Sequence, residues 1–237
     1  MNYPAAYPHD ALQEIADEVF MIRGSIKMNP LVKISRNMAV IRRHGELTLV
    51  NPMRLSEEGE KNLTGLGSIA RILRLGPMHG LDDRYYADRF HAELWTRPGG
   101  TVYPDPPLTK AIDETVELGI SGTRLFCFEN CLLPEAALLV TGEPGLLLTC
   151  DALQHYGDFS HNNFLARTLL PLIGFSKTTL IGPPWLKLAT PEGGSLRSEF
   201  ERLLELPFDR LLSAHGTHLE NGAHVAVERA VANAFEK

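Results

Sequence analysis

Short apolar runs separated by polar turn residues make up most of the first 150 residues, and this pattern predicts strands. Two of the runs flank His44-Gly45, which is typical of a hairpin with a two-residue turn. Three others lie close together between residues 123 and 149 and predict a second, largely antiparallel sheet. The predicted strands cover residues 18–24, 38–43, 46–50, 69–75, 92–96, 123–128, 136–140, 146–149 and 210–212.

Helical spacing of apolar positions is concentrated in the last third of the chain. Earlier, Ser56 followed by acidic residues predicts a capped helix start. Two strand-rich blocks, each followed by helices, predict two mostly antiparallel sheets packed face to face with helices outside. No shift in composition marks a boundary, so residues 1–237 are expected to form a single domain. The other predicted helices cover residues 82–90, 163–173, 195–206 and 223–235.

Composition excludes several classes of function. The net charge of −6 argues against a nucleic-acid-binding protein, which needs a clustered basic footprint. Three cysteines without a C-x-x-C pair predict reduced thiols and a cytoplasmic location. The N-terminus has no apolar signal region, and no run approaches the roughly 18 residues of a membrane helix. We therefore expect a small-molecule substrate and no nucleic-acid or membrane partner. The apolar helix predicted at residues 163–173 leaves homo-oligomerisation open.

Three predicted strands end in turns that carry imidazole or carboxylate groups. The first turn, residues 76–86, contains His79 and Asp83 between a strand and a helix. The second turn ends at Asp151, and the third contains His215. These side chains are common metal ligands and acid-base catalysts. We expect the three turns to converge on one site.

Each of these residues also has a purely structural interpretation. Asp82 can serve as a helix N-cap, Asp83 as a first-turn acid and His79 as a hydrogen-bonded turn residue. Asp151 ends an apolar strand, where a carboxylate is costly without a partner, and this favours a site. His155 either lines the same pocket as a proton donor or substrate contact, or is a loop residue. Only the joint pattern favours function over structure.

The order of the elements and the three turns together resemble the metallo-β-lactamase superfamily, which implies an αββα sandwich of the α+β class. In that family a His-x-His-x-Asp-His turn, a later lone His, an Asp after a Leu-rich strand and a C-terminal His hold one or two metal ions. Residues 145–152 (GLLLTCDA) look like the strand with the Asp, and residues 211–216 (LLSAHG) look like the C-terminal His turn. The resemblance covers nearly the whole chain.

The first turn departs from the family pattern. With His79 on the first His of the motif, Leu81 stands at the second His and Arg84 at the last one. Near residues 130–136, where the lone His belongs, Glu135 is the only strong ligand type. The resemblance therefore implies a degenerate metal motif, in which the first metal position is lost and the second is partly kept.

The ligands that the resemblance implies are His79, Asp83, Asp151 and His215. Two carboxylates and imidazole suit one divalent metal ion, with Zn first and Fe or Mn as alternatives. Such an ion lowers the pKa of a bound water and makes it a nucleophile. Arg84 would bring a fixed positive charge close to the ion, or would replace the ion by pairing with Asp83 or Asp151.

Two functions are compatible with these residues. The first is a metal-dependent hydrolase with a mononuclear site, in which a metal-bound water attacks an ester, thioester, lactone or phosphoester. Its catalytic candidates are Asp83, His79 and His155. The second is a catalytically inactive, metal-free relative that acts as a ligand- or protein-binding module. Asp151 and His215 favour the enzyme, whereas the lost histidines favour the module.

Overall fold

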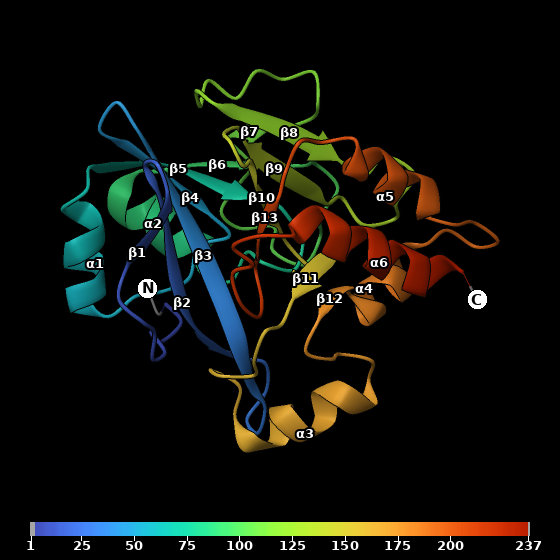
Figure 1. Cartoon of the computed structure of the whole chain (residues 1–237). Helices are drawn as coiled ribbons and strands as arrows, with labels where there is room; N and C mark the ends of the chain where they lie inside the picture. Colours follow the sequence, from blue (N-terminus) through green and yellow to red (C-terminus); the bar gives the residue numbers. More distant parts are fainter. Residues whose placement is uncertain (1–2, 237) are drawn as a thin grey trace.

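Residues 3–236 are described by the computed structural model, and a seven-stranded sheet forms one layer of it (Figure 1). The strands follow sequence order, and pairing is antiparallel from β1 to β4 and parallel from β4 to β7. They are β1 (Gln13–Ala16), β2 (Val19–Lys27), β3 (Lys33–Arg43), β4 (Glu46–Val50), β5 (Ser68–Arg74), β6 (Glu93–Thr96) and β7 (Lys110–Ala111).

A four-stranded sheet in the order β13-β10-β9-β8 forms the second layer. Neighbours among β8, β9 and β10 are antiparallel, as predicted, and β13 joins β10 in parallel. β11 and β12 form a separate two-stranded antiparallel sheet. The strands are β8 (Thr123–Cys127), β9 (Ala136–Val140), β10 (Leu146–Thr149), β11 (Leu153–His155), β12 (Thr179–Ile181) and β13 (Arg210–Ser213).

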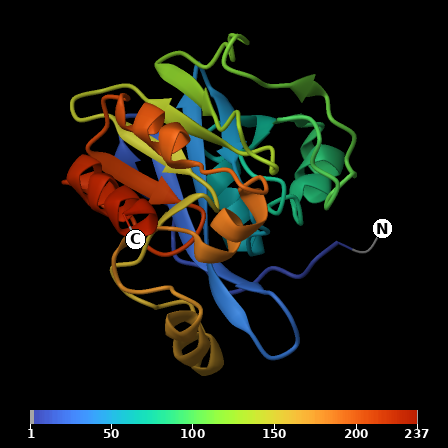
Figure 2. The ribbon, with the colours of Figure 1, turned by 90° about the vertical axis from the view of Figure 1, so that its right-hand side faces the viewer.

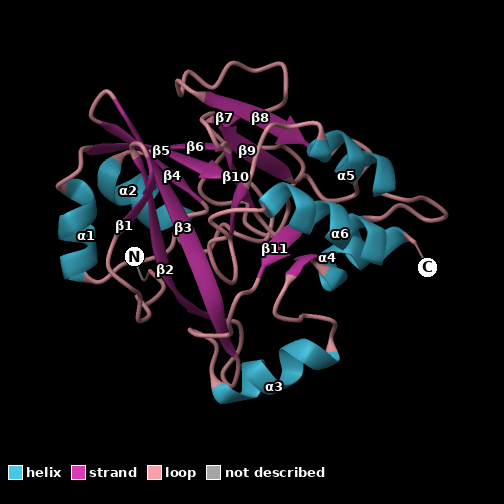
Figure 3. Ribbon diagram, in the orientation of Figure 1, coloured by secondary structure: helices cyan, strands magenta, loops and turns pink. Residues whose placement is uncertain are grey.

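Helices cover the outer faces of the two sheets (Figure 3). Two of them pack on the large sheet, and three pack on the outer side of the small sheet. α3 lies apart from both layers, beside the far end of β2 and β3 (Figures 1 and 2). The helices are α1 (Glu57–Thr64), α2 (Asp83–Phe90), α3 (Phe164–Leu172), α4 (Pro183–Ala189), α5 (Arg197–Leu204) and α6 (Ala223–Phe235). No helix among the described residues is long and apolar enough to cross a bilayer.

The main core fills the space between the sheets. Along β3, Ala39 and Ile41 face this core, whereas Met38 and Val40 pack under the outer helices. Successive side chains of a strand point to opposite faces, so a strand covered on both sides reads as an unbroken apolar run. This explains why the strands were predictable and confirms the two-sheet sandwich.

Half of the large sheet is parallel, which the sequence analysis did not predict. α1 connects β4 to β5 and α2 connects β5 to β6, and crossovers of this length bring strands back in parallel. Five short elements were not predicted from the sequence either: β1, β7, β11, β12 and α4. The missed strands have two to four residues, and α4 begins with two prolines.

The hairpin turn between β3 and β4 has the geometry that its sequence predicts. His44 and Gly45 have φ values of 53° and 78°, as a type I′ turn requires. We expect Gly45→Ala to lower the free energy of unfolding by about 1 kcal/mol, because a Cβ is strained at this φ. Urea denaturation measures the change. Gly142→Ala, at a turn glycine without positive φ, is the control and should be nearly neutral.

Candidate functional site

Side chains from the three predicted turns meet at one point. His79 follows β5, Asp151 follows β10 and His215 follows β13. The Nε2 atom of His79 lies 3.2 Å from Oδ1 of Asp151, and Nε2 of His215 lies 3.4 Å from the same oxygen. The two imidazole rings meet edge to face, with centroids 4.9 Å apart. All three potential ligand atoms lie within 4.8 Å of one another, and all three residues are buried.

Strand topology brings the turns together. β10 and β13 are parallel neighbours, with Thr149 opposite Ser213, so Asp151 and His215 emerge at the same edge of the small sheet. β5 belongs to the large sheet, and Leu75 at its end accepts a hydrogen bond from the Ala136 amide of the small sheet. The candidate site therefore lies where the ends of the two sheets meet.

Two buried asparagines tie these ends together. Asn51, after β4, accepts a hydrogen bond from the Leu75 amide at 2.9 Å and donates to the Thr149 carbonyl at 3.4 Å. Asn37, in β3, donates to the Ser213 carbonyl at 2.8 Å, and its amide donates to Ala214 at 2.8 Å. Neither asparagine was singled out from the sequence. The available signal was their place beside apolar runs, since Asn37 precedes residues 38–43 and Asn51 follows residues 46–50.

A backbone carbonyl fixes the orientation of His215. Its Nδ1 lies 2.6 Å from the Ser35 carbonyl oxygen, which can only accept, so Nδ1 carries a proton. In a neutral ring, Nε2 then presents its lone pair to Oδ1 of Asp151. Two electron-rich atoms face each other unless a cation or a second ring proton lies between them. Imidazole ligands of metals are commonly oriented by such a bond from the other ring nitrogen.

Burial and mutual contact set the ionisation of the pair His79 and Asp151. Burial lowers the pKa of His79 to about 4, although the Asp151 carboxylate opposes the shift. Burial alone would raise the pKa of Asp151, but His79 and His215 outweigh it and hold that pKa well below its usual range. An ionised carboxylate and a neutral His79 imidazole are the forms that bind a metal.

These residues fit a divalent metal ion. Two imidazoles and one carboxylate form a set that proteins use for Zn and for non-haem Fe, and it leaves positions open for water or substrate. The lone pair of His215 directed at Asp151 is the observation that favours a cation between them.

Two further buried polar residues surround the cluster. Arg36, 2% exposed, donates to the carbonyls of Pro52 at 3.0 Å and His79 at 2.9 Å. Glu135, fully buried, accepts a hydrogen bond from the Ala152 amide beside Asp151. Burial raises the pKa of Glu135 well above its usual range, and the Asp151 charge raises it further. Glu135 thus occupies the region where the family pattern expects a histidine.

The structure does not bring Asp83 into the cluster. Its carboxylate is fully buried, and Oδ2 lies 3.2 Å from Nη1 of Arg74. Burial raises the pKa of Asp83 to about 7, against the opposing charges of Arg74 and Arg36. At the first helical position of α2, the Asp83 side chain pairs within the large sheet. Asp83 therefore contacts Arg74 and lies outside the group of potential ligand atoms formed by His79, Asp151 and His215.

Arg84 and His155 also lie away from the cluster. Arg84 bonds to Asp88 at 2.7 Å and to Asp105 at 2.5 Å, so its charge does not replace an ion beside Asp151. Nδ1 of His155 lies 2.8 Å from the Thr179 hydroxyl, across the β11–β12 strand pair. Burial lowers the pKa of His155. The side chain holds the two strands together, and it is absent from the lining of the pocket beside the cluster.

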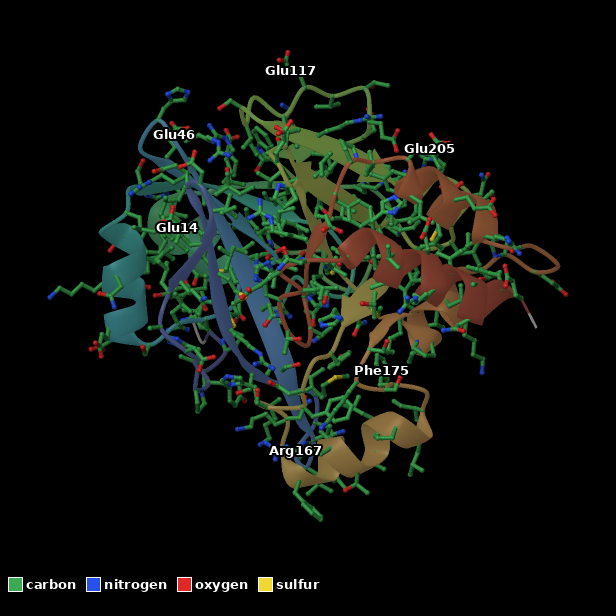
Figure 4. All side chains as sticks on the ribbon, viewed as in Figure 1. Glu14, Glu46, Glu117, Arg167, Phe175 and Glu205 are labelled. Atoms are coloured by element: carbon green, nitrogen blue, oxygen red, sulfur yellow. The ribbon has the colours of Figure 1, made fainter. Side chains whose placement is uncertain are left out.

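A pocket of about 550 Å³ opens beside the cluster. Its polar lining includes the three clustered residues, Arg36, Gln154 and Lys27, and Leu81 lines it where the family pattern has a histidine. The remaining wall is mainly apolar and comes from the far ends of β2 and β3, from α3 and from α4. Phe175, labelled in Figure 4 between α3 and the body of the protein, belongs to this wall. Other apolar wall residues are Ile34, Met78, Leu170, Trp185 and Leu188.

The sandwich of two sheets is a fold that solved structures share. The DIM-1 metallo-β-lactamase exposed to ceftazidime matches with a TM-score of 0.69 and 8% identity, over 97% of this chain and 100% of that one. VMB-1 matches with a TM-score of 0.68 and 10% identity, over 95% and 96%. A flavo di-iron protein from Thermotoga maritima matches with a TM-score of 0.63 and 15% identity, over 95% and 62%.

The chain has the metallo-β-lactamase fold, as its sequence resemblance implied. At 7–15% identity these similarities establish the fold and leave the reaction open. No protein-family model matches the sequence, and no curated protein matches it either. The activity must therefore be argued from the site itself.

The asparagine links between the sheets can be tested by stability. Asn51→Ala leaves the buried Leu75 amide without its partner and removes one of two hydrogen bonds to the Thr149 carbonyl, which keeps the Ala214 amide. We expect a loss of about 2 kcal/mol in the free energy of unfolding. Asn51→Gly loses the same hydrogen bonds but adds no backbone strain, because glycine adopts the φ of 50° freely. Its loss of stability therefore measures the hydrogen bonds alone. Asn62→Ala, at an exposed position of α1, is the control. A neutral Asn51→Gly variant would contradict the role of these bonds.

Proposed function

We propose that the protein is a hydrolase that uses one divalent metal ion held by His79, Asp151 and His215. The observation that carries the proposal is the approach of both Nε2 atoms to a single oxygen of Asp151, with the His215 lone pair directed at it. Zn is the first choice for this donor set, and Fe or Mn are alternatives. The proposed ligand set omits Asp83, which pairs with Arg74.

A bound ion would supply Lewis-acid activation of water and of the bond to be cleaved. The protein's own groups prepare the site. The Ser35 carbonyl holds the His215 ring so that Nε2 faces the pocket. The Arg36 guanidinium, fixed by two carbonyls, places a permanent positive charge on the pocket wall, where it would stabilise negative charge on a substrate oxygen. Glu135 holds the backbone after Asp151 by accepting a hydrogen bond from the Ala152 amide, and burial raises the pKa of Glu135 well above its usual range.

The pocket favours a substrate with a sizeable apolar group. Its lining is predominantly aliphatic and aromatic, and the cluster, with Arg36, supplies a group of polar atoms within it. Such a pocket binds through apolar burial and orients the ligand with a few polar contacts. An ester, thioester or lactone with a hydrocarbon chain meets both conditions, because its polar bond would lie at the cluster and its chain along the wall. A phosphoester with a similar chain is the remaining alternative.

A second candidate is a metal-free binding module for an apolar ligand. The observation that favours it is that Leu81, an apolar wall residue, replaces a histidine of the family pattern. In this case the pocket would serve the same ligands without cleaving them. The two candidates differ in metal content and turnover.

Metal content tests the proposed ligand set. We expect protein purified without chelator to contain about one equivalent of Zn, Fe or Mn by elemental analysis. Asp151→Asn should lose it, because the amide oxygen is a much weaker ligand. Asp83→Asn is the matched control, since it changes an equally buried carboxylate outside the cluster. Less than roughly a tenth of an equivalent in the parent after adding each metal would favour the binding module.

The apolar pocket predicts chain-length selectivity. Leu169 on α3 lines the pocket and is 40% exposed, so Leu169→Trp can narrow the mouth without disturbing the core. On p-nitrophenyl esters, we expect it to lower kcat/KM for octanoate by about tenfold and to spare acetate. Thr168→Trp, on the same helix but outside the lining, is the control. Equal losses on both esters would show that the chain does not lie in this pocket.

A further inference from the structure

Large apolar side chains are exposed around the mouth of the pocket. Met28 and Leu31, at the far end of β2 and β3, are 66% and 71% exposed, and Phe164 and Leu172 on α3 are 85% and 77% exposed. Leu188 on α4 is 56% exposed. Met28 and Leu188 also line the pocket, so the exposed surface continues into it. Contiguous apolar surface of this kind marks an interaction site.

α3 has apolar residues on two faces. Ala166 and Leu170 point inward and line the pocket, whereas Phe164 and Leu172 point to solvent. The helix carries a single charged residue, Arg167. A helix with apolar residues on two faces normally buries both, yet α3 stands clear of both sheet layers (Figures 1 and 2). Its outer face therefore needs a partner from outside the described chain.

The exposed side chains belong to one anchored surface. Asn163, the N-cap of α3, donates to the carbonyls of Lys33 at 3.0 Å and Leu31 at 2.7 Å. Asn162 accepts a hydrogen bond from the Ser35 amide at 2.7 Å. These bonds hold the start of α3 against β3, so the two groups of apolar residues lie side by side.

The two chain segments that carry this surface contain basic residues and no acidic ones. Residues 19–45 and 159–191 contain no aspartate or glutamate, although the whole chain has a net charge of −6. None of the five basic residues that accompany the apolar ones forms an ion pair with another described residue. The flanking acids Asp10 and Asp158 are paired with His161 and Arg23. The five basic residues are Lys27, Lys33, Arg167, Lys177 and Lys187.

We infer that this surface docks the protein on an anionic lipid bilayer. The docking surface comprises Met28, Leu31, Phe164, Leu172 and Leu188 with the five basic residues around them. Apolar side chains that enter the interface and a rim of Lys and Arg are the two features that bind peripheral proteins to anionic membranes. This revises the expectation from sequence, which considered only spans and signals. The docking does not depend on the metal site.

Charge decides between a bilayer and a second copy of the chain. In a two-fold dimer formed through this surface, each basic rim would face its own copy, and like charges would repel. An anionic bilayer instead pairs with the rim while it accepts the apolar side chains. The proposed docking would also turn the pocket mouth toward the lipid. This orientation would suit substrates with a hydrocarbon chain, an argument that rests on the proposed function.

Vesicle flotation tests the inference. We expect the full-length protein to float with phosphatidylcholine vesicles that contain phosphatidylglycerol, to bind weakly to phosphatidylcholine alone, and to be released by high salt. Phe164→Ser with Leu172→Ser should lower the partition coefficient by roughly tenfold or more. Val225→Ser, an exposed position on α6, is the control. Both variants should have the melting temperature of the parent by circular dichroism, since the altered side chains are exposed.

Charge reversal tests the basic rim separately. Lys177→Glu with Lys187→Glu should weaken binding to anionic vesicles by at least roughly 25-fold, about fivefold for each lost charge. Lys61→Glu on α1 is the control. Asp151→Asn should bind vesicles as the parent does, so a failed metal site and a failed docking surface give different results.

Three results would overturn the inference. One is that anionic lipid does not increase binding, whether the protein binds neutral and anionic vesicles equally or binds neither. Another is unchanged binding by Phe164→Ser with Leu172→Ser. The third is a parent dimer in light scattering that this double variant converts to a monomer, because a second copy would then cover the surface.

Discussion

The candidate site depends on a carboxylate that is buried where two sheets meet. Asp151 ends an apolar strand and is nearly removed from solvent, and such a group is stable only when partners offset its lost hydration. His79 and His215 are those partners, and each comes from a different strand end. The geometry of the whole sandwich is thus constrained by the need to bring two imidazoles to one oxygen. An ion between them would satisfy the same constraint more fully.

Two asparagines link the ends of the two sheets where the candidate site lies. Asn37 and Asn51 are buried amides that donate to carbonyls of the opposite sheet, and Asn51 also accepts from Leu75 at the end of β5 in its own sheet, so the ends of β5, β10 and β13 are held together. Side-chain amides are suited to the task because they both donate and accept without a charge. A charged residue at either position would compete with Asp151 for the imidazoles. The two asparagines therefore support the site without adding a charge beside Asp151.

Much of the fold was accessible from the sequence because the strands are apolar on both faces and the caps are local. Ser56 caps α1 and His44-Gly45 forms the predicted turn, since each depends on its neighbours alone. The parallel half of the large sheet and the short strands depend on long-range pairing that no local pattern records. At the site, the turns that carry Asp151 and His215 were identifiable from strand ends. The contact between Asp83 and Arg74 could not be predicted, because the turn between them is not described by sequence spacing.

The pocket and the docking surface both depend on the position of α3, which lies apart from the two sheet layers. α3 leaves the body after β11 and returns at β12, and its start is fastened to β3 by Asn162 and Asn163. This excursion encloses apolar space beside the cluster, and it also leaves the outer face of the helix without a partner in the described chain. A helix that only closed a pocket would be expected to carry polar residues outside. Because α3 carries Phe164 and Leu172 there instead, the same element that shapes the pocket also determines what the pocket mouth faces.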